Sequence, residues 1–417
     1  MQLKTILNKV APQSSFVYGK IDLREIDGRE SITVRIRPRK NSRPICSKCH
    51  QKRPGYDTLP ERSFEFVPFW QIAVFFIYSM RRVNCPDCGI RVEEVPWAVG
   101  NCHLTIMYKW FLSAWAKRLS WIEVALIFHI SWSTVFRCVS AAVEWGLKHR
   151  DLSGIESIGV DEVQWQKGHE YLTLVYQIDK GMKRLLWIGV DRSQATLRRF
   201  FKELPEIVRN EIRYVCSDMW KPYLKVIAEE LPKTVHILDR FHIMKAINKA
   251  IDKVRAEESR KLKSDGFEPI LKNSRWCLLK RRENLTENQT VKLKELLKYN
   301  LKTVKSYLMK EDFQRFWKFK STGWARRFLR EWCDRTMRSK IEPMKQVAKM
   351  LRKHEELLLN WFKARGQISA GIVEGLNNKL KLRSRKSYGF RTFEVAEIAL
   401  YHELGNLPTP EFTHKFW

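Results

Sequence analysis

Short runs and alternations of hydrophobic residues mark three closely spaced strands in the middle of the chain. They cover residues 157–165, 171–176 and 185–190. Each of the two short connections contains a glycine, Gly168 or Gly181, as is typical of turns that close β-hairpins. The pattern therefore predicts three consecutive antiparallel strands.

Two further strands follow in the same region, and a helix precedes each of them. The four elements are predicted at residues 196–204 (helix), 212–217 (strand), 223–230 (helix) and 234–238 (strand). Ser193 is a suitable N-cap for the first helix. Three antiparallel strands followed by helix, strand, helix and strand is the succession of a ribonuclease-H-like α/β fold, in which the fourth strand lies beside the first.

Helical periodicity replaces the strand pattern at residues 104–150. An apolar-faced helix is predicted at 120–129, a turn at 130–134 and a second helix at 135–143. This is the layout of a helix-turn-helix, whose second helix enters the DNA major groove. The candidate DNA contacts at the start of that helix are Ser133, Thr134 and Arg137. A plain helical spacer would give the same pattern.

Two C-x-x-C pairs lie near the amino terminus, Cys46 with Cys49 and Cys85 with Cys88. Two such knuckles supply the four thiolates of one closed, structural zinc site. Hydrophobic patterns around them predict three strands, at residues 31–36, 64–67 and 72–78. The total of nine cysteines is odd, and in a reducing compartment paired C-x-x-C motifs favour metal over disulfides. Unrelated free thiols are the alternative, and with four ligands supplied we expect no ligand from the adjacent Cys-His at 102–103.

From about residue 241 the chain is predicted to be almost wholly helical and strongly basic. A last distinctive segment, residues 371–381, contains Glu374. A basic stripe accompanies this acid, and its members are Lys379, Lys381, Arg383, Arg385 and Lys386. Charge runs are often only solvated faces, but if Glu374 belongs to a site that acts on nucleic acid, phosphate binding is the better hypothesis, and it predicts steep salt dependence.

Together these patterns predict an α+β multidomain protein with five parts. They are a zinc-ribbon-like module (1–100), a helix-turn-helix DNA-binding domain (101–150), the first part of a ribonuclease-H-like α/β catalytic core (151–250), a large helical insertion (251–360) and the carboxyl-terminal part of the core with Glu374 (361–417).

Charge changes this picture more than length or hydrophobicity does. The 417 residues include 77 Lys and Arg against 46 Asp and Glu, a net charge of +31. Such an excess attracts polyanions, and nucleic acid is the commonest of these. A membrane-surface or ribosome-associated protein is the alternative. The most apolar window, residues 69–80, is too short to span a bilayer and no secretory leader is visible, so we expect a cytoplasmic protein without a membrane partner.

Three acids could supply the chemistry on nucleic acid. Asp161 lies at the centre of the first strand, Asp218 ends the fourth strand and Glu374 lies on a late helix. Phosphodiester cleavage needs two divalent cations about 4 Å apart, and Mg²⁺ prefers carboxylate oxygens. Asp239 and Asp191 also end strands, and each is a rival to Asp218, which we favour because the fourth strand neighbours the first.

The chain resembles a DDE transposase of bacterial insertion sequences, of the ISL-three family. The resemblance covers nearly the whole chain, and the segments that carry it are residues 159–162, 217–223, 236–242, 373–381 and 388–393. It implies that Asp161, Asp218 and Glu374 are catalytic and bind two Mg²⁺. It further implies a nucleoid-associated bacterial protein that binds terminal inverted repeats, nicks them and joins the freed 3′-OH ends to target DNA. A homo-oligomer on double-stranded DNA is expected, since two element ends are cut in concert.

The roles of three neighbouring residues, His236, Asp239 and His242, stay open at this point. Either histidine could contact phosphate or orient a ligand, or be a satisfied structural residue. Asn377 and Asn378 could contact DNA or be solvent-exposed. Two other functions also fit: a non-catalytic sequence-specific DNA-binding regulator on a ribonuclease-H-like scaffold, and a structure-selective nuclease on the same fold.

Overall fold

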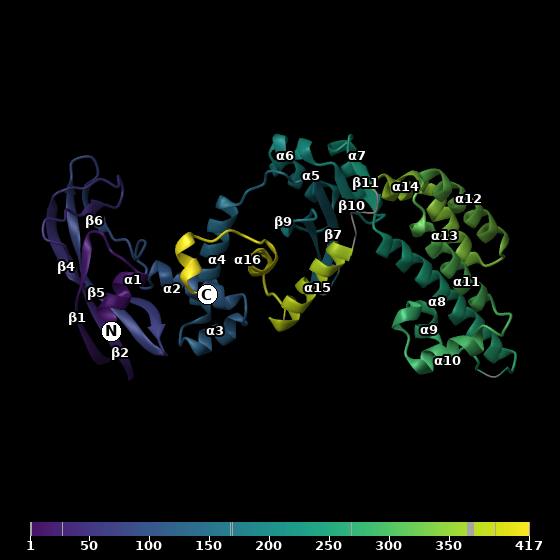
Figure 1. Cartoon of the computed structure of the whole chain (residues 1–417), viewed down its shortest axis with the longest axis horizontal. Coiled ribbons are helices and arrows are strands. Elements are labelled where there is room, and N and C mark those ends of the chain that lie inside the picture. The colour runs from purple at the N-terminus through teal and green to yellow at the C-terminus, as the bar shows by residue number, and fades with distance from the viewer. Residues whose placement is uncertain are drawn as a thin grey trace. The chain divides into compact units, whose positions relative to one another are not determined.

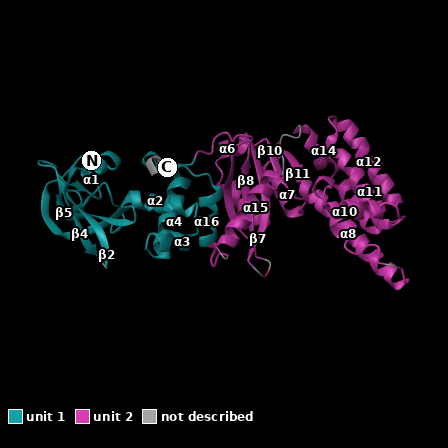
Figure 2. Cartoon of the chain, turned by 60° about the horizontal axis from the view of Figure 1, so that its bottom comes forward, with its two compact units in different colours: residues 1–150, 394–417 teal, residues 151–393 magenta. Residues whose placement is uncertain are grey.

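The computed structural model describes residues 2–26, 28–166, 168, 170–267, 269–364, 371–387 and 389–416. The chain forms two compact units (Figure 2). Unit 1 comprises residues 1–150 and 394–417, and unit 2 comprises residues 151–393. The carboxyl-terminal segment thus packs with the amino-terminal half, whereas the finer five-part division stays a prediction.

Unit 1 contains a mixed, mostly antiparallel sheet that follows helix α1 (Leu3–Val10). Its strands are β1 (Phe16–Ile26), β2 (Arg29–Pro38), β3 (Ile45–Cys46), β4 (Gly55–Phe69), β5 (Ile72–Cys85) and β6 (Gly89–Glu94). The order is β1-β2-β5-β6-β3, and β4 pairs with β5. Alternating side chains of β2, β4 and β5 are buried, and Trp97 packs edge-on against Phe16 and Tyr78 in this core.

Three helices continue unit 1: α2 (Ile106–Ala116), α3 (Trp121–Ile127) and α4 (Trp132–His149). Ser120 and Glu123 form a capping box on α3, and Ser131 caps α4. The second helix therefore begins at residue 132, three residues before the predicted start, because the serine before it satisfies the first free backbone N–H groups. The carboxyl-terminal elements α16 (Phe393–Leu404) and η3 (Glu411–Phe416) belong here too. His402 of α16 hydrogen-bonds Ser113 of α2 at 3.1 Å.

Within the described residues, no single helix is both long and apolar enough to cross a bilayer. Only α3 and α4 taken together reach that length and composition, and they are bent by 118° at the break between them.

Unit 2 is built on a five-stranded sheet (Figure 1). Its strands are β7 (Ser157–Gln166), β8 (Glu170–Ile178), β9 (Lys183–Val190), β10 (Tyr214–Ser217) and β11 (Val235–Leu238). The order is β11-β10-β7-β8-β9; β7, β8 and β9 are antiparallel, while β10 runs parallel to both β7 and β11. All five predicted strands are confirmed, as is the pairing of the fourth with the first.

Different helices cover the two faces of β7. Ile158 and Val160 point into a core shared with α5 (Gln194–Glu203) and α7 (Lys221–Glu230), and α6 (Glu206–Glu211) packs on the same core. Gly159 points to the opposite face, against α15 (Gly371–Lys386). A Cβ atom on Gly159 would lie 2.5 Å from Val373 Cγ2, so only glycine permits this close approach.

A block of helices lies between β11 and α15 in the chain (Figure 1), over the residues predicted as a helical insertion, and its role as an insertion into a catalytic core stays a prediction. Its elements are α8 (Arg240–Ser264), α9 (Arg275–Leu279), η1 (Arg282–Asn284), α10 (Glu287–Leu296), α11 (Lys302–Phe313), η2 (Gln314–Lys318), α12 (Thr322–Arg338), α13 (Glu342–Lys353) and α14 (Glu355–Lys363). Its hydrophobic core includes Trp332 and Phe313.

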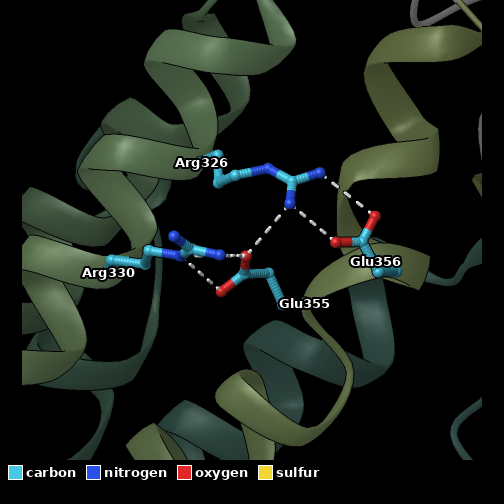
Figure 3. Close-up of polar contacts among 4 residues, drawn as sticks. All are labelled: Arg326, Arg330, Glu355 and Glu356. Atoms are coloured by element: carbon cyan, nitrogen blue, oxygen red, sulfur yellow. Dashed lines mark hydrogen bonds and ion pairs between the residues drawn. The ribbon is translucent and has the colours of Figure 1, made fainter.

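Ion pairs tie two helices of this block together (Figure 3). Arg330 of α12 contacts Glu355 of α14 at 2.7 Å, and Arg326 contacts Glu356 at 2.8 Å and Glu355 at 3.6 Å. Both arginines are partly exposed, so the network orients the helices while the apolar core supplies most of the stability.

Candidate functional site

Asp161 lies on β7, on the face that α15 covers. Asn377 of α15 donates a hydrogen bond from Nδ2 to Asp161 Oδ2. Tyr176 of β8 donates to Asn377 Oδ1 at 2.7 Å. The backbone N–H of Glu162 donates to Asp161 Oδ1 at 2.8 Å. Both carboxylate oxygens of Asp161 are therefore oriented by the protein itself, through a chain of contacts that crosses from the sheet to the helix.

Asp218 follows β10 directly, next to β7. The pairing of Cys216 with Gly159 sets this register, and the backbone N–H of Trp220 donates to Asp218 Oδ1 at 3.0 Å. Burial raises the pKa of Asp218, and the negative charge of Asp161 adds to the rise. Burial also raises the pKa of Asp161. Two buried carboxylates with raised pKa values form a site that a bound cation would stabilise, because the cation favours their ionised form.

Asp239 directly follows β11 and lies close enough to Asp161 for their charges to interact. It is 6% exposed, and its Oδ1 accepts a hydrogen bond from the backbone N–H of Phe241 at 2.6 Å. Burial raises the pKa of Asp239 to about 6; His242 and the Phe241 N–H act against this rise, and the charges of Asp161 and Glu374 add to it. His242 Nε2 lies 3.9 Å from Asp239 Oδ2.

Glu374 lies on the first turn of α15, three residues before Asn377. Residues three apart share a helix face. The hydrogen bond from Asn377 to Asp161 thus orients this face toward β7. The negative charge of Glu374 contributes to the raised pKa of Asp239, which places the two acids near each other. In the described part of the chain, the acids do not form a group whose ligand atoms all lie within 4.8 Å of one another.

Glu162 points to the opposite face of β7 from Asp161, as the period of two along a strand requires. There it forms an ion pair with Arg192 at 2.8 Å. The Arg192 guanidinium also lies over the rings of Tyr171 and Trp220, at 4.3 and 5.4 Å from their centroids. Arg192 is thereby fixed beside the end of the sheet at which the acids gather.

His236 has the environment of a structural residue. Its Nε2 is 2.7 Å from Ser217 Oγ, and its backbone oxygen accepts a hydrogen bond from Asn360 Nδ2 at 2.8 Å. Burial lowers the pKa of His236 to about 4, so the ring is neutral at physiological pH. The other histidine of this segment, His242, is the one whose charge reaches the acids.

The four cysteines of the two knuckles meet in unit 1. The Sγ atoms of Cys46, Cys49, Cys85 and Cys88 all lie within 4.8 Å of one another. Cys46 lies on β3 and Cys85 ends β5, so the sheet brings the pairs together across the long intervening hairpin. Gly89, with φ 73°, allows the chain to turn back after the second knuckle.

This quartet has the dimensions of a tetrahedral metal site. Four sulfurs each 2.3 Å from a central zinc ion would be about 3.8 Å apart, and Cys49 Sγ and Cys85 Sγ are 3.7 Å apart. Burial and the neighbouring thiolates raise the pKa of Cys88 to about 12. Backbone N–H groups of Cys49 and Lys48 instead lower the pKa of Cys46. Four thiolates this close repel one another unless a cation lies between them.

The three predicted DNA contacts of the helix-turn-helix segment lie in the first two turns of α4. Ser133 is exposed and its Oγ is 2.9 Å from Ser131 Oγ. Arg137 is exposed too, and its guanidinium contacts Thr134 Oγ1 at 3.2 Å and the Ser133 oxygen at 3.3 Å. Exposed Ser133 and Arg137, together with half-buried Thr134, offer one cation and two hydroxyl groups at the start of α4.

The basic stripe beside Glu374 divides between two faces of α15. Its exposed members are Lys379, Lys381, Arg385 and Lys386. Arg383 is only 5% exposed, because Val373, Leu376, Leu380 and Arg383 recur at helical spacing on the buried side. Arg383 is therefore not among the exposed cations that could bind phosphate, which corrects its inclusion in the stripe.

Comparison with known proteins agrees with this arrangement. Residues 158–400 match the family model of the ISL3 (ISL-three) group, described as a transposase. The transposase for insertion sequence element IS1001 of Bordetella parapertussis is 30% identical over 353 residues, covering 84% of this chain and 86% of that protein. The transposase for IS1557 of Mycobacterium tuberculosis is 27% identical over 426 residues, covering 96% and 95%.

This basic chain, with buried acids on and beside the central strand of a mixed sheet, is thus a transposase, an enzyme that cuts and joins DNA strands. It belongs to the ISL3 family of DDE transposases found in insertion sequences.

Proposed function

We propose that the chain is the transposase of an insertion sequence and that it cuts and joins the ends of its own element through the triad Asp161, Asp218 and Glu374. The observation that carries this proposal is the hydrogen bond from Asn377 to Asp161, because it ties the helix that bears Glu374 to the strand that bears Asp161. Without that contact, the late glutamate would have no fixed relation to the two aspartates.

The order of the sheet supports a ribonuclease-H-like catalytic core. Strands β7, β8 and β9 form an antiparallel meander, and β10 and β11 extend it in parallel on the β7 side. In this topology the centre of β7 and the end of β10 are neighbours. The helical block of α8–α14 is then an insertion between β11 and α15.

The three carboxylates would hold two Mg²⁺ ions, which when bound stabilise the attacking and leaving oxygens of a phosphodiester. Asn377 orients Asp161, and Trp220 orients Asp218. The ring of His242 lies beside the same acids, with its Nε2 3.9 Å from Asp239 Oδ2. Ions held in this way would be shared with substrate phosphate and water rather than enclosed by protein.

The remaining sites would bind DNA rather than cut it. The Cys₄ cluster would hold one structural Zn²⁺, and Ser133, Thr134 and Arg137 would contact the terminal inverted repeats in the major groove. Exposed Lys379, Lys381, Arg385 and Lys386 would bind phosphate close to the triad. We expect a homo-oligomer on DNA, associated with the bacterial nucleoid, because two ends are processed together.

The test is a strand-transfer assay with purified protein, Mg²⁺, a DNA end with a free 3′-OH group and a target duplex. Asp161→Asn and Glu374→Gln are each expected to reduce joined product at least about 10³-fold while leaving DNA affinity unchanged. Glu287→Gln is the matched control, because Glu287 is an exposed acid on α10 of the same unit.

Each outcome separates the transposase from the other two functions. Cleavage without joined product would indicate a structure-selective nuclease. DNA binding with neither cleavage nor joining in the wild-type protein would indicate a non-catalytic regulator. Full strand transfer by Asp161→Asn or Glu374→Gln would overturn the triad.

A further inference from the structure

A tryptophan stands at the tip of the hairpin β4–β5. Trp70 and Gln71 form the two-residue turn between Phe69 and Ile72, which pair with each other. Both turn residues have positive φ, 47° for Trp70 and 69° for Gln71. Positive φ at both positions characterises the type I′ turn, which strongly favours Asn and Gly. A bulky side chain is sterically disfavoured in this backbone conformation.

This side chain also projects into solvent. Among the large hydrophobic side chains of the described residues, Trp70 is the most exposed, at 89%. Phe69 is 37% exposed, and its ring stacks on that of Trp70 with the centroids 5.4 Å and the planes 27° apart. Both the strained turn and the exposed apolar area cost free energy in the isolated protein. Within the described part of unit 1, the stacking of Phe69 is the ring contact of Trp70, and it leaves most of the tryptophan exposed.

The surroundings of the tip carry both signs of charge. Ser31 of β2 pairs with Ala73 of β5, so Arg29, two residues earlier, lies at the same end of the sheet as the turn. Glu25 and Glu30, which pair with each other, share that end. One cation and two acids form no positive patch for phosphate, so recognition at the tip depends on the aromatic surface.

The size of this surface limits what it can bind. An aromatic side chain buries about 150–250 Å², whereas a stable protein interface needs about 800 Å² on each partner. Two rings are therefore too small to hold a second copy of the chain. A nucleobase is a flat ring that stacks on tryptophan, and apolar side chains insert between base steps of distorted DNA. The net charge of +31 and the transposase family both make DNA the available source of bases.

We propose that Trp70, supported by Phe69, is a base-stacking contact of the amino-terminal module with DNA that is unpaired or kinked. This inference rests on the proposed function only in requiring DNA as the partner. It assigns base stacking to a hairpin that would otherwise only link the two halves of the zinc cluster.

The test compares Trp70→Asn with wild-type full-length protein on three probes of one sequence: a paired duplex, the same duplex with a single bulged base, and one of its strands alone. Asparagine suits a type I′ turn, so the variant is expected to unfold at the same or a higher temperature. Loss of stacking is expected to weaken binding about 5- to 100-fold. Trp70→Phe is expected to restore most of the affinity. Trp324→Ala, which removes a 61% exposed tryptophan of α12, is the matched control and is expected to bind normally.

The pattern over the three probes distinguishes the two sources of the base. A loss on the bulged duplex and the single strand supports an unpaired base, and a loss on the paired duplex as well supports insertion at a kinked step. A 2-aminopurine at the bulge is expected to be quenched by wild-type protein and not by Trp70→Asn. The salt dependence of binding is expected to stay unchanged, since no cation is removed.

Two results would overturn the proposal while leaving the proposed function intact. One is equal binding of all three probes by Trp70→Asn and wild type. The other is a change in the sedimentation of DNA-free protein with unchanged DNA binding, which would make the tip a protein contact. Failure of the wild-type protein to bind any probe would overturn this proposal and the proposed function together.

Discussion

Asn377 is the residue through which α15 reaches the acidic cluster, and nothing in the local sequence distinguishes it from Asn378. In the structure Asn377 is buried and hydrogen-bonded to Asp161 and Tyr176, while Asn378 is exposed. The position of Asp239 near Asp161 was likewise not predictable, because Asp239 and Asp218 compete for one role in the sequence, with Asp191 as a further rival. Only the register of the sheet shows that both lie near Asp161.

We expect Asn377→Ala to lower the rate of strand transfer about 10- to 100-fold, because Asp161 loses the group that orients it. Mn²⁺ affinity measured by calorimetry is expected to fall by a similar factor, while DNA affinity stays unchanged. Asn378→Ala is the control and is expected to match wild type in both measurements. Equal behaviour of the two variants would remove Asn377 from the site.

Asp239 gives a prediction for the pH dependence of stability without metal. Its pKa is raised to about 6 in the folded protein from 3.8. Folding therefore favours the protonated acid. Asp239 leaves the free energy of unfolding unchanged below about pH 4 and lowers it as the pH rises from about 4 to about 6. Above about pH 6 the free energy of unfolding stays at the lower value. Asp239→Asn keeps the helix cap and removes this loss.

The variant is therefore expected to exceed wild type in unfolding free energy by about 2–3 kcal/mol at pH 7. The two proteins are expected to converge near pH 4. Denaturant unfolding with a metal chelator present measures both quantities. A difference that is constant with pH would mean that Asp239 binds protons equally in the folded and unfolded states, so that burial does not raise its pKa.

At the scale of elements, the hydrophobic pattern was most informative for buried strands. All five strands of the unit 2 sheet follow runs whose side chains are largely buried, and each was predicted within a few residues. Strand β1 was not predicted, because much of this edge strand is exposed and carries charged side chains. The start of α4 was misplaced because Ser131, Ser133 and Thr134 are all possible caps, and only the backbone shows that Ser131 is the one used.

The two cysteine knuckles are expected to bind one zinc ion together. Inductively coupled plasma analysis of the purified chain is expected to give one zinc per chain, and Cys46→Ser is expected to lose it and to unfold at a lower temperature. Cys102→Ser is the control, since Cys102 is outside the quartet, and it is expected to retain the metal. Zinc near zero in freshly purified wild-type protein would contradict the site.

The first turns of α4 should carry DNA recognition. Arg137→Ala is expected to weaken binding to the terminal repeats by about 1–3 kcal/mol and to relax the preference for repeat over random DNA. Lys148→Ala, an exposed cation in the last turn of the same helix, is expected to change the preference little. Equal effects of the two substitutions in a competition binding assay would indicate general charge attraction.

At the scale of the whole molecule, the net charge and the chain order of the motifs indicated a DNA-processing enzyme. The packing of its ends was not predictable. Residues 394–417 belong to unit 1, although they follow α15, the helix that carries Glu374, in the sequence. An amphipathic segment shows which face is buried but not which partner buries it, so tertiary pairing over hundreds of residues has no local pattern.

Iron-directed cleavage tests the shared metal site most directly. Fe²⁺ replaces Mg²⁺ in the DNA-bound protein, and the hydroxyl radicals it generates cut the nearest backbone. Cuts are expected at the centre of β7, at the end of β10 and in the first turn of α15, and all three should vanish together in Asp161→Asn. Cuts at β7 and β10 with none in α15 would mean that Glu374 does not share the ions, and the proposed triad would be wrong.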